Sequence, residues 1–444
     1  MEKQELIDSE KNVAKKLSLF FRENINPFFR KKLKGGALYV SILVSIIIGV
    51  VLTFFILIAQ YNQRNVTTYT QLTQLYYNLK SAFQIAQSAY FSPEQNYIWI
   101  KNQENDDSIR VKKLNWGAYL LISAETKNRH QYLSQAGIYG TYMSSDTGLL
   151  ISDNSRPVGL SGNIVFKSNC YLPKAGIKPA YIEGQSYVSS SQNSSYIKQS
   201  PYQIPHLTAS VYSGLKEQLS NFNSNLDSSV KTLPETYSHS FNHKTIVWQN
   251  PSALLSRVEL VNNIKLVAEN IEIDSSAHLN NILIVCKKAR FKKGFKGKIH
   301  VIASDSISME EGCEFNYPSS FVLLAAEGET NAIKYIQFNK NCRFYGGVLA
   351  VSKIKGNAND QKVFVKLHAE SEVNGFVYSS DYIHLEGLVN ATVIANKLLL
   401  KTPSAVYENH LLSCEINPKK HSSMLTVPLV FNERAKLLCC ETIN

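Results

Sequence analysis

The sequence predicts a mainly β fold: a single-stranded parallel β-helix (solenoid) with coils of about 18 residues, behind an N-terminal transmembrane helix and with small helical and β insertions. Two observations lead to this prediction. A nine-residue pattern recurs through the C-terminal half of the chain, and a 21-residue apolar run, Leu38–Ile58, lies near its start. The first indicates stacked short strands, and the second indicates a membrane anchor.

The repeat reads apolar, any, apolar, three polar or loop-like residues, one small residue, any, apolar. Its first positions are 271, 289, 307, 336, 365, 383 and 398, so the steps are 18, 18, 29, 29, 18 and 15 residues. Each long step equals the basic 18 plus an 11-residue excursion. One coil cannot bury its apolar edge alone, so stacking over residues 261–410 is expected. The copies are Ile271-Ile273-Ala277-Leu279, Ile307-Met309-Cys313-Phe315, Ile336-Phe338-Cys342-Phe344, Val365-Leu367-Ser371-Val373 and Leu398-Leu400-Ser404-Val406, with two weaker ones, Ala289-Phe291-Phe295-Gly297 and Ile383-Leu385-Val389-Ala391.

The apolar run predicts a transmembrane helix over 37–60, embedded through residues 38–58, because 21 helical residues span about 30 Å. The flank before it carries Arg30, Lys31, Lys32 and Lys34, whereas the flank after it carries only Arg64 before Lys80. The positive-inside rule therefore makes residues 1–36 a cytoplasmic basic tail and places everything after Gln60 outside. We expect a single-pass, signal-anchored membrane protein with a large domain in the periplasm or at the cell surface.

The helix is expected to continue as an amphipathic juxtamembrane helix over 61–92, ended by Ser92-Pro93. Its predicted apolar face is Val66, Tyr69, Leu72, Tyr76, Leu79, Phe83, Ala86 and Tyr90. With the basic leader Lys34-Gly35-Gly36-Ala37-Leu38 before it, this segment resembles type IV prepilins and minor pilins. The resemblance implies cleavage after Gly36, although Ser41 then stands where prepilins usually carry Glu. A plain, uncleaved signal anchor is the alternative.

Residues 93–260 are expected to form a mixed β subdomain, with short strands within Tyr97–Leu121 and Gln131–Ile151, a loop over Gly184–Tyr202, and a helical insert at 207–233. An isolated copy of the repeat, Ile164-Phe166-Cys170-Leu172, predicts that this region contributes one coil or a capping edge to the solenoid. Residues 411–444 are expected to form a separate C-terminal segment.

Seven cysteines occur without a C-x-x-C motif or Cys-His spacing suited to a metal, so neither a metal nor a cofactor is expected. Cys170, Cys313 and Cys342 occupy the small position of the repeat and predict one interior column. Cys286 precedes its coil's first position by three residues, as Ala268 and Ala395 do. These four are interpreted as small buried hydrophobes, with a disulfide between neighbouring coils as the alternative. Cys414, Cys439 and Cys440 lie outside the pattern.

The net charge is +12, of which residues 1–36 carry +4 and the remainder +8. One run is strongly basic, and its apolar members Phe291 and Phe295 match inward positions. The basic side chains are candidates for binding an anionic surface polymer such as nucleic acid, lipopolysaccharide, wall glycan or lipid head groups. The alternative is a solvated coil whose charges discourage aggregation. The candidates are Lys287, Lys288, Arg290, Lys292, Lys293, Lys296 and Lys298.

No catalytic residue is predicted. The acids of the repeat region do not return to one column at the 18-residue step, and motifs for nucleophilic or metal-dependent hydrolysis are missing from the sequence. His368 and His384 are expected to face solvent. A glycan-active β-helix enzyme is kept as an alternative.

The 18-residue coils resemble the polymer-forming domain of bactofilins over about residues 262–409. Asn263–Ile273 and Gly297–Ile307 carry the resemblance, which implies end-to-end self-assembly. This chain departs from that family in its external solenoid and its flanking segments. The sequence therefore predicts a non-catalytic structural or interaction module of a bacterial-type envelope, with self-assembly or envelope proteins as partners. The alternative is a minor-pilin-like component of a pilus or secretion filament.

Overall fold

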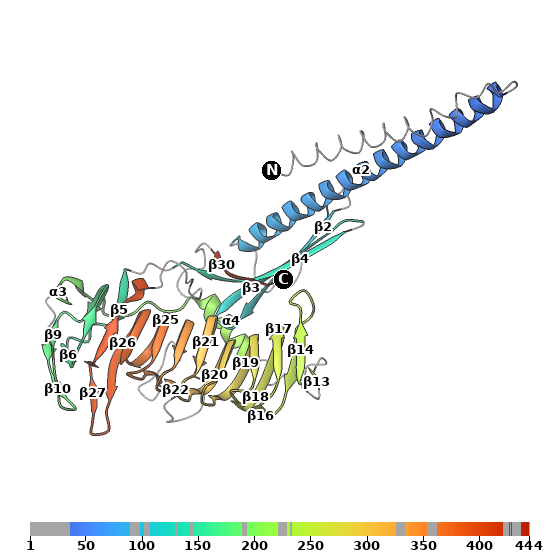
Figure 1. The fold of residues 1–444 in the computed structure, drawn as a ribbon. Coiled ribbons are helices and arrows are strands. Elements are labelled where there is room, and N and C mark those ends of the chain that lie inside the picture. Colours follow the sequence, from blue (N-terminus) through green and yellow to red (C-terminus); the bar gives the residue numbers. More distant parts are fainter. Residues whose placement is uncertain are drawn as a thin grey trace. The chain divides into compact units, whose positions relative to one another are not determined.

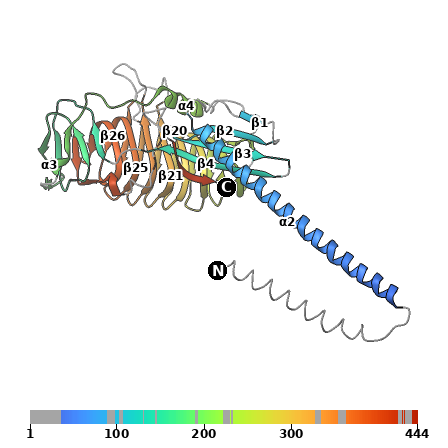
Figure 2. The same cartoon turned by 90° about the horizontal axis from the view of Figure 1, so that it is seen from above.

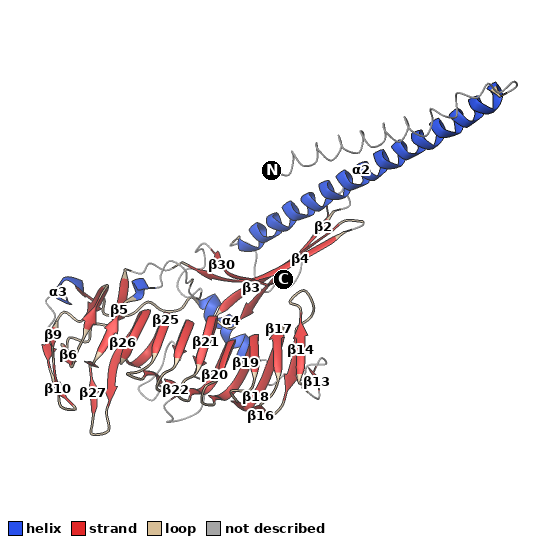
Figure 3. Cartoon of the chain, in the orientation of Figure 1, coloured by secondary structure: helices blue, strands red, loops and turns tan. Residues whose placement is uncertain are grey.

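The computed structural model describes residues 36–88, 98–101, 107–129, 131–142, 146–188, 193–220, 229–230, 233–325, 334–352, 362–420, 426, 428 and 437–443. Within these residues the protein is mainly β with one long apolar helix near the N-terminus, as predicted (Figure 3). The tail up to residue 35, and segments 326–333 and 353–361 within the two long steps of the repeat, lie outside the described residues.

The helix α2 (Ala37–Gln87) is continuous over 51 residues, so the predicted transmembrane and juxtamembrane helices are one element. Residues 89–92 of the predicted helix lie outside the described residues. The helix is long and apolar enough to cross a membrane. The chain divides between Thr73 and Gln74 into two compact units.

In the second unit the helix buries Leu75, Leu79, Ala82 and Ala86. The predicted apolar face was therefore wrong in part: Val66, Tyr69 and Tyr76 are 66, 73 and 50% exposed. The residue spacing identified an amphipathic helix. The side of the helix that is buried is narrower than predicted and consists of small and aliphatic residues, which allow its backbone to lie close to its neighbour.

An antiparallel sheet provides that contact. Leu79, Ala82 and Ala86 pack against Val111 and Ile122 in one apolar cluster. The sheet order is β1-β2-β3-β4-β30. Its strands are β1 (Ile98–Lys101), β2 (Ser108–Trp116), β3 (Tyr119–Lys127), β4 (Tyr132–Thr141) and β30 (Leu437–Ile443). Because β30 pairs with β4, the 411–444 segment is not separate, and most of the chain is inserted between these two neighbouring strands.

The largest sheet is closed, and all its pairings are parallel except the β26–β27 hairpin (Figure 1). In chain order its strands are β5 (Thr147–Ile151), β7 (Val165–Phe166), β8 (Asn169–Leu172), β12 (Ile197–Gln199), β13 (Ser229–Val230), β14 (Thr236–His239), β15 (Ile246–Gln249), β16 (Ser252–Leu255), β17 (Glu259–Asn262), β18 (Ile264–Ile273), β19 (His278–Phe291), β20 (Lys296–Met309), β21 (Glu314–Leu324), β22 (Lys334–Phe338), β23 (Arg343–Val351), β24 (Val363–Leu367), β25 (Glu372–His384), β26 (Gly387–Lys401), β27 (Val406–Glu408) and β29 (Cys414–Ile416).

The register of this sheet confirms the predicted first positions of the repeat. Each pairs with the next, so one column runs Ile271, Ala289, Ile307, Ile336, Val365, Ile383, Leu398. Ala253 extends the column by one strand that the sequence pattern missed. All members are 7% exposed or less, which is the burial that the apolar spacing predicts.

Two copies of the repeat need correction. After Leu400 the chain turns back, and Val406 pairs with Lys401 in an antiparallel hairpin, leaving Val406 58% exposed. In the copy that begins at Ile383, Val389 rather than Ala391 pairs with Val373. The copy at Ile383 begins the shortest step, of 15 residues, so fewer residues are available to complete its path.

The parallel sheet extends beyond residues 261–410 in both directions. It includes β13 to β17 before that range and β29 after it, and Val393 pairs with Leu149 of the earlier segment. The predicted contribution of the 164–172 copy is confirmed, since Phe166 pairs with Ile416 and Cys170 with Leu149.

Smaller elements complete this region. They are β6 (Val158–Ser161), β9 (Ile177–Pro179) and β28 (His410–Leu412) in a three-stranded sheet, the hairpin β10 (Tyr181–Ile182) and β11 (Gln185–Ser186), α3 (Asn193–Tyr196), α4 (Ala209–Ser220) and the 3-10 turn η2 (Pro418–Lys420). The predicted loop over 184–202 was wrong because β11, α3 and β12 lie in it. The predicted helix over 207–233 is correct for α4, but Ser229–Val230 is a strand that pairs with β15.

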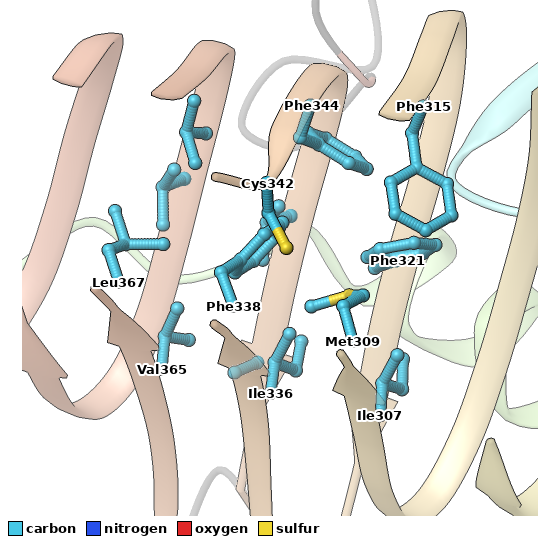
Figure 4. Close-up of a cluster of buried hydrophobic side chains, with 14 of the residues drawn as sticks. Ile307, Met309, Phe315, Phe321, Ile336, Phe338, Cys342, Phe344, Val365 and Leu367 are labelled. Atoms are coloured by element: carbon cyan, nitrogen blue, oxygen red, sulfur yellow. The ribbon is translucent and has the colours of Figure 1, made fainter. Parts of the chain in front are cut away.

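The interior of the closed sheet is apolar, and its centre is aromatic (Figure 4). The outer face of the same strands is covered as well. Val285, Ile302 and Val322 pack with Tyr119 and Leu121 of the antiparallel sheet. The helix α4 also covers this face (Figure 2). The central strands are therefore buried on both faces, which explains their long unbroken apolar runs.

The cysteines are small buried side chains in part as predicted. Cys286 lies in one column with Ala268 and Ala303, which continues to Ala395. Cys313 and Cys342 occupy equivalent positions on successive repeats, but Cys170 pairs with Leu149 and Ile197 in a different column. The prediction of one column for all three was wrong because the 164–172 copy joins the sheet in another register.

Candidate functional site

The seven candidate cations lie on β19, on β20 and in the turn between them, where the sequence places them side by side. Their alternation with buried residues is confirmed, since Ala289, Phe291 and Phe295 are at most 1% exposed. The side chains of Arg290, Lys293 and Lys296 are more than half exposed, and those of Lys287 and Lys292 are 45 and 38% exposed. Lys298 is the exception, with a side chain only 15% exposed.

Six of the seven cations face carboxylates, mostly from the neighbouring repeat. Lys298 pairs with Glu441 on β30. Among the described residues, Lys288 alone of the seven forms no ion pair. The other distances are 3.0 Å for Lys287–Glu269, 2.7 Å for Arg290–Glu310, 2.8 Å for Lys292–Glu272, 2.9 Å for Lys293–Glu311 and 3.3 Å for Lys296–Glu314.

These contacts change the electrostatics of the face. The hydrogen bond from Lys292 lowers the pKa of Glu272. The hydrogen bond between Lys293 and Glu311 raises the pKa of the amine and lowers that of the carboxyl. Both partners stay charged at neutral pH, so the basic run is a network of opposite charges rather than a free positive stripe.

The partners could have been found from the sequence. Glu269 and Lys287, Lys293 and Glu311, and Lys296 and Glu314 are each 18 residues apart, which is the period of the repeat. A parallel in-register sheet places residues one period apart on adjacent strands. A search for opposite charges at that spacing would have predicted the network.

One outward column also alternates in sign. It runs Lys296, Glu314, Arg343, Glu372 along four paired strands. Opposite charges facing each other across strands stabilise a sheet, and a register error would bring like charges together. The arrangement therefore helps to specify how the repeats stack.

The histidines differ from their prediction in one case. His384 is 2% exposed rather than facing solvent, and its Nε2 lies 3.1 Å from Glu386. Burial raises the pKa of Glu386, but the imidazole of His384 outweighs this effect and the pKa is lowered. The hairpin formed by β26 and β27 was not predicted, and Lys401 at its start donates its backbone N–H to His384 Nδ1 at 3.3 Å.

A second polar cluster, which the sequence did not reveal, lies between the two sheets. His300 Nδ1 is 2.9 Å from Ser320 Oγ, and its ring meets Tyr119 edge-on at 5.9 Å. Burial lowers the pKa of His300 to about 3. The imidazole is neutral at physiological pH and serves packing rather than proton transfer. In the described part of the chain, no group of three or more His, Cys, Asp or Glu side chains is placed to hold a metal ion.

Lys265 lies in the same interface, where its Nζ donates to the carbonyl of Gln218 at 3.3 Å. Burial lowers the pKa of Lys265 to about 8. The folded state therefore disfavours the ammonium form that the unfolded chain keeps up to a pKa of about 10.4. The charge costs stability fully below pH 8, and the cost disappears as pH rises towards 10.

We expect Lys265→Met to increase the free energy of unfolding at pH 7 by about 1–3 kcal/mol. The difference between the variant and the wild type should shrink between pH 8 and 10. Urea titration of the full chain in detergent, followed by tryptophan fluorescence, measures both. Lys288→Met, at an exposed position, is the control. A pH-independent difference would contradict the assignment to a buried charge.

For the basic run, we expect the combined replacement of Lys287, Lys288, Lys292, Lys293 and Lys296 by Gln to weaken binding to a sulfated polysaccharide less than about threefold. Four of the five already face carboxylates, so little free positive charge is removed. Elution of the full chain from such a column against salt is the measurement, with Lys288→Gln as the matched single variant. A tenfold, salt-sensitive loss would support the anionic-polymer interpretation instead.

No family model, curated protein or solved structure matches this chain.

Proposed function

We propose that the closed parallel sheet is a parallel β-helix and that the protein is a membrane-anchored, extracytoplasmic structural or interaction module of a bacterial-type envelope, without catalysis. The strand register of the closed parallel sheet is the observation that supports this proposal best. Seven positions at steps of 15 to 29 residues form one hydrogen-bonded apolar column. Stacked coils of a solenoid have this arrangement, and solenoids present extended surfaces to partners.

The anchor supports the proposed location. Tyr39 and Tyr61 lie near the two ends of the apolar part of α2, and tyrosines are enriched at both faces of a bilayer. Twenty-two residues of helix span about 33 Å, which is close to the thickness of the hydrocarbon core. The excess of Lys and Arg before Leu38 favours an internal N-terminus.

The charged residues support a non-catalytic role. Acid–base catalysis needs carboxylates that are free to exchange protons with a substrate. Glu269, Glu272, Glu310, Glu311 and Glu314 are instead held by cations of adjacent repeats. These acids stabilise the stack, and a glycan-active enzyme is the less favoured alternative.

The sheet ends are the surfaces we propose for partners. Within the described residues, β14 pairs only with β17, and β16 only with β18. Unpaired strand edges can accept a strand from another chain. A second copy or another envelope protein could dock there, as the bactofilin resemblance implies. In the three-stranded sheet, Pro179 in the edge strand β9 limits such pairing, because proline cannot donate a ladder hydrogen bond.

A minor-pilin-like role is the second candidate, and one observation favours it. The helix α2 is bare and apolar over Leu38–Ile58 and packs against an antiparallel sheet near its end. A filament subunit needs a helix with two such halves. One half lies in the membrane or in a helix bundle, and the other half packs against the folded domain. The intact mass of the N-terminus tests it, because cleavage after Gly36 would remove the leader.

Topology provides the main test. Protease added outside intact cells, or to spheroplasts if an outer membrane is present, should digest the region beyond Gln60 and spare residues 1–36. An epitope at each end, detected by blotting, distinguishes the fragments, and detergent-lysed cells show that the tail is cleavable. Protection of the region beyond Gln60 in spheroplasts would refute the extracytoplasmic location.

A further inference from the structure

We infer that Cys313 and Cys342 are a dithiol that closes as a disulfide between adjacent repeats while the protein folds. The inference rests on the proposed extracytoplasmic location for its oxidant, because oxidising compartments retain disulfides. In the structure both thiols are free and fully buried. Their backbone spacing and side-chain directions are those that a disulfide requires.

The backbone brings the two residues together. Glu314 pairs with Arg343, and the Arg343 N–H donates to the carbonyl of Cys313 at 2.9 Å. Cys313 and Cys342 are thus equivalent residues, each directly before one of two adjacent parallel strands, β21 and β23, and such strands are about 4.8 Å apart. Disulfides join Cα atoms about 4.4–6.8 Å apart, so the bond needs no strand movement.

The side chains point the same way. Each cysteine follows a residue with positive φ, Gly312 in one repeat and Asn341 in the next, so both leave the same kind of corner. The Cys313 thiol lies 3.3 Å from the carbonyl of Lys292, and the Cys342 thiol lies 3.1 Å from that of Glu310. Both thiols therefore donate to backbone carbonyls of the preceding repeat.

The pair forms its bond by thiol–disulfide exchange. The Cys342 thiolate attacks a disulfide of the oxidant, which is a dithiol oxidoreductase or oxidised glutathione, and releases one sulfur as a thiolate. Cys313 then loses its proton and attacks the Cys342 sulfur, forming the bond and releasing the second sulfur. Two protein thiols are oxidised, the oxidant is reduced to two thiols, and the two protons go to the leaving sulfurs.

Because both thiols are buried in the folded protein, oxidation has to occur during folding. An oxidant cannot reach a fully covered thiol, so exchange occurs before the repeats have closed over both residues. The disulfide then closes a 29-residue loop that contains segment 326–333. Closing a loop of this size lowers the population of the opened chain by about 10²-fold.

The test uses the full chain in detergent, refolded from urea with oxidised or reduced glutathione. Peptide mapping without reductant should find Cys313 linked to Cys342, and proteolysis through the opened state should slow by about 10²-fold. Cys313→Ala and Cys342→Ala should each abolish both effects. Cys286→Ala is the matched control, because Cys286 has alanines as neighbours in register and should behave like the wild type.

Refolded wild type without this link, or with other cysteines joined, would overturn the inference. Alkylation of the thiols in cells distinguishes failure of the disulfide inference from failure of the proposed location. If the pair links in vitro but alkylation shows both thiols reduced in cells, the location is wrong and the geometry stands. If the region beyond Gln60 is external and the thiols are still reduced in cells, the inference itself fails.

Discussion

Replacing Phe321 by alanine should lower the free energy of unfolding by about 3–5 kcal/mol. Its ring lies 4.9 Å from that of Phe315, 4.8 Å from that of Phe344 and 6.2 Å from that of Phe338, all fully buried inside the parallel sheet. These rings come from two adjacent repeats, so one truncation opens a cavity that both repeats line. Aromatic contacts add about 0.5–1.5 kcal/mol per pair to the loss.

Denaturant titration of the full chain in detergent, followed by tryptophan fluorescence, measures this loss. Phe321→Leu fills most of the volume and should cost about 1 kcal/mol. Tyr335→Ala, at a site 37% exposed, is the surface control. Equal losses for the alanine variants at the two sites would show that the cluster is not a centre of stability.

Gly346→Ala should cost about 3 kcal/mol or more. Gly346 has φ of 145°, and a Cβ atom there would lie 1.9 Å from the carbonyl oxygen of Ser319 on the adjacent strand. Gly375, the next residue in the same column, has φ of 123° and would clash with the carbonyl of Gly346. A backbone atom cannot move aside as a flexible side chain can, so the two strands would have to separate.

Gly294→Ala isolates the cost of the clash. Gly294 also has positive φ, but open space surrounds it, so that substitution should cost only about 1–2 kcal/mol of backbone strain. The two variants are compared by the same denaturant titration. A Gly346→Ala protein as stable as Gly294→Ala would mean that the adjacent strand can yield at this corner.

The sequence could predict the short strands in which buried and exposed residues alternate. Ile336 and Phe338 are inside while Tyr335 and Gln337 are more exposed, so this copy alternates with period 2. The copy at Ile383 breaks the alternation, because His384 is also buried. The strand holding Phe321 follows no such rule. Its outward residues are covered by the antiparallel sheet and by α4, so both faces are apolar and periodicity cannot assign them.

Long-range pairing was the other limit. Nothing near Leu437 indicates that it pairs with Thr141, and the local spacing around Ile164 could not give its register against Leu149 and Ile416. The candidate cations alternate with the buried residues Ala289, Phe291 and Phe295, as the repeat predicts. Most of their ion pairs join adjacent repeats, as that of Lys287 and Glu269 does, so these pairs can be predicted only by comparing residues one repeat apart.

The position of β30 makes completion of the antiparallel sheet depend on residues that follow the long insert. The sheet that packs against α2 is finished by Leu437–Ile443, and Lys298 in the parallel sheet receives its carboxylate from Glu441 on the same strand. A chain interrupted before residue 437 would expose the edge of β4 and leave Lys298, which is largely buried, without this partner. Quality-control proteases recognise such exposed edges and unfilled interfaces. A nascent chain can therefore close the unit that holds the helix only after Leu437–Ile443 has been made, so the pairing of β30 reports that the preceding insert is present.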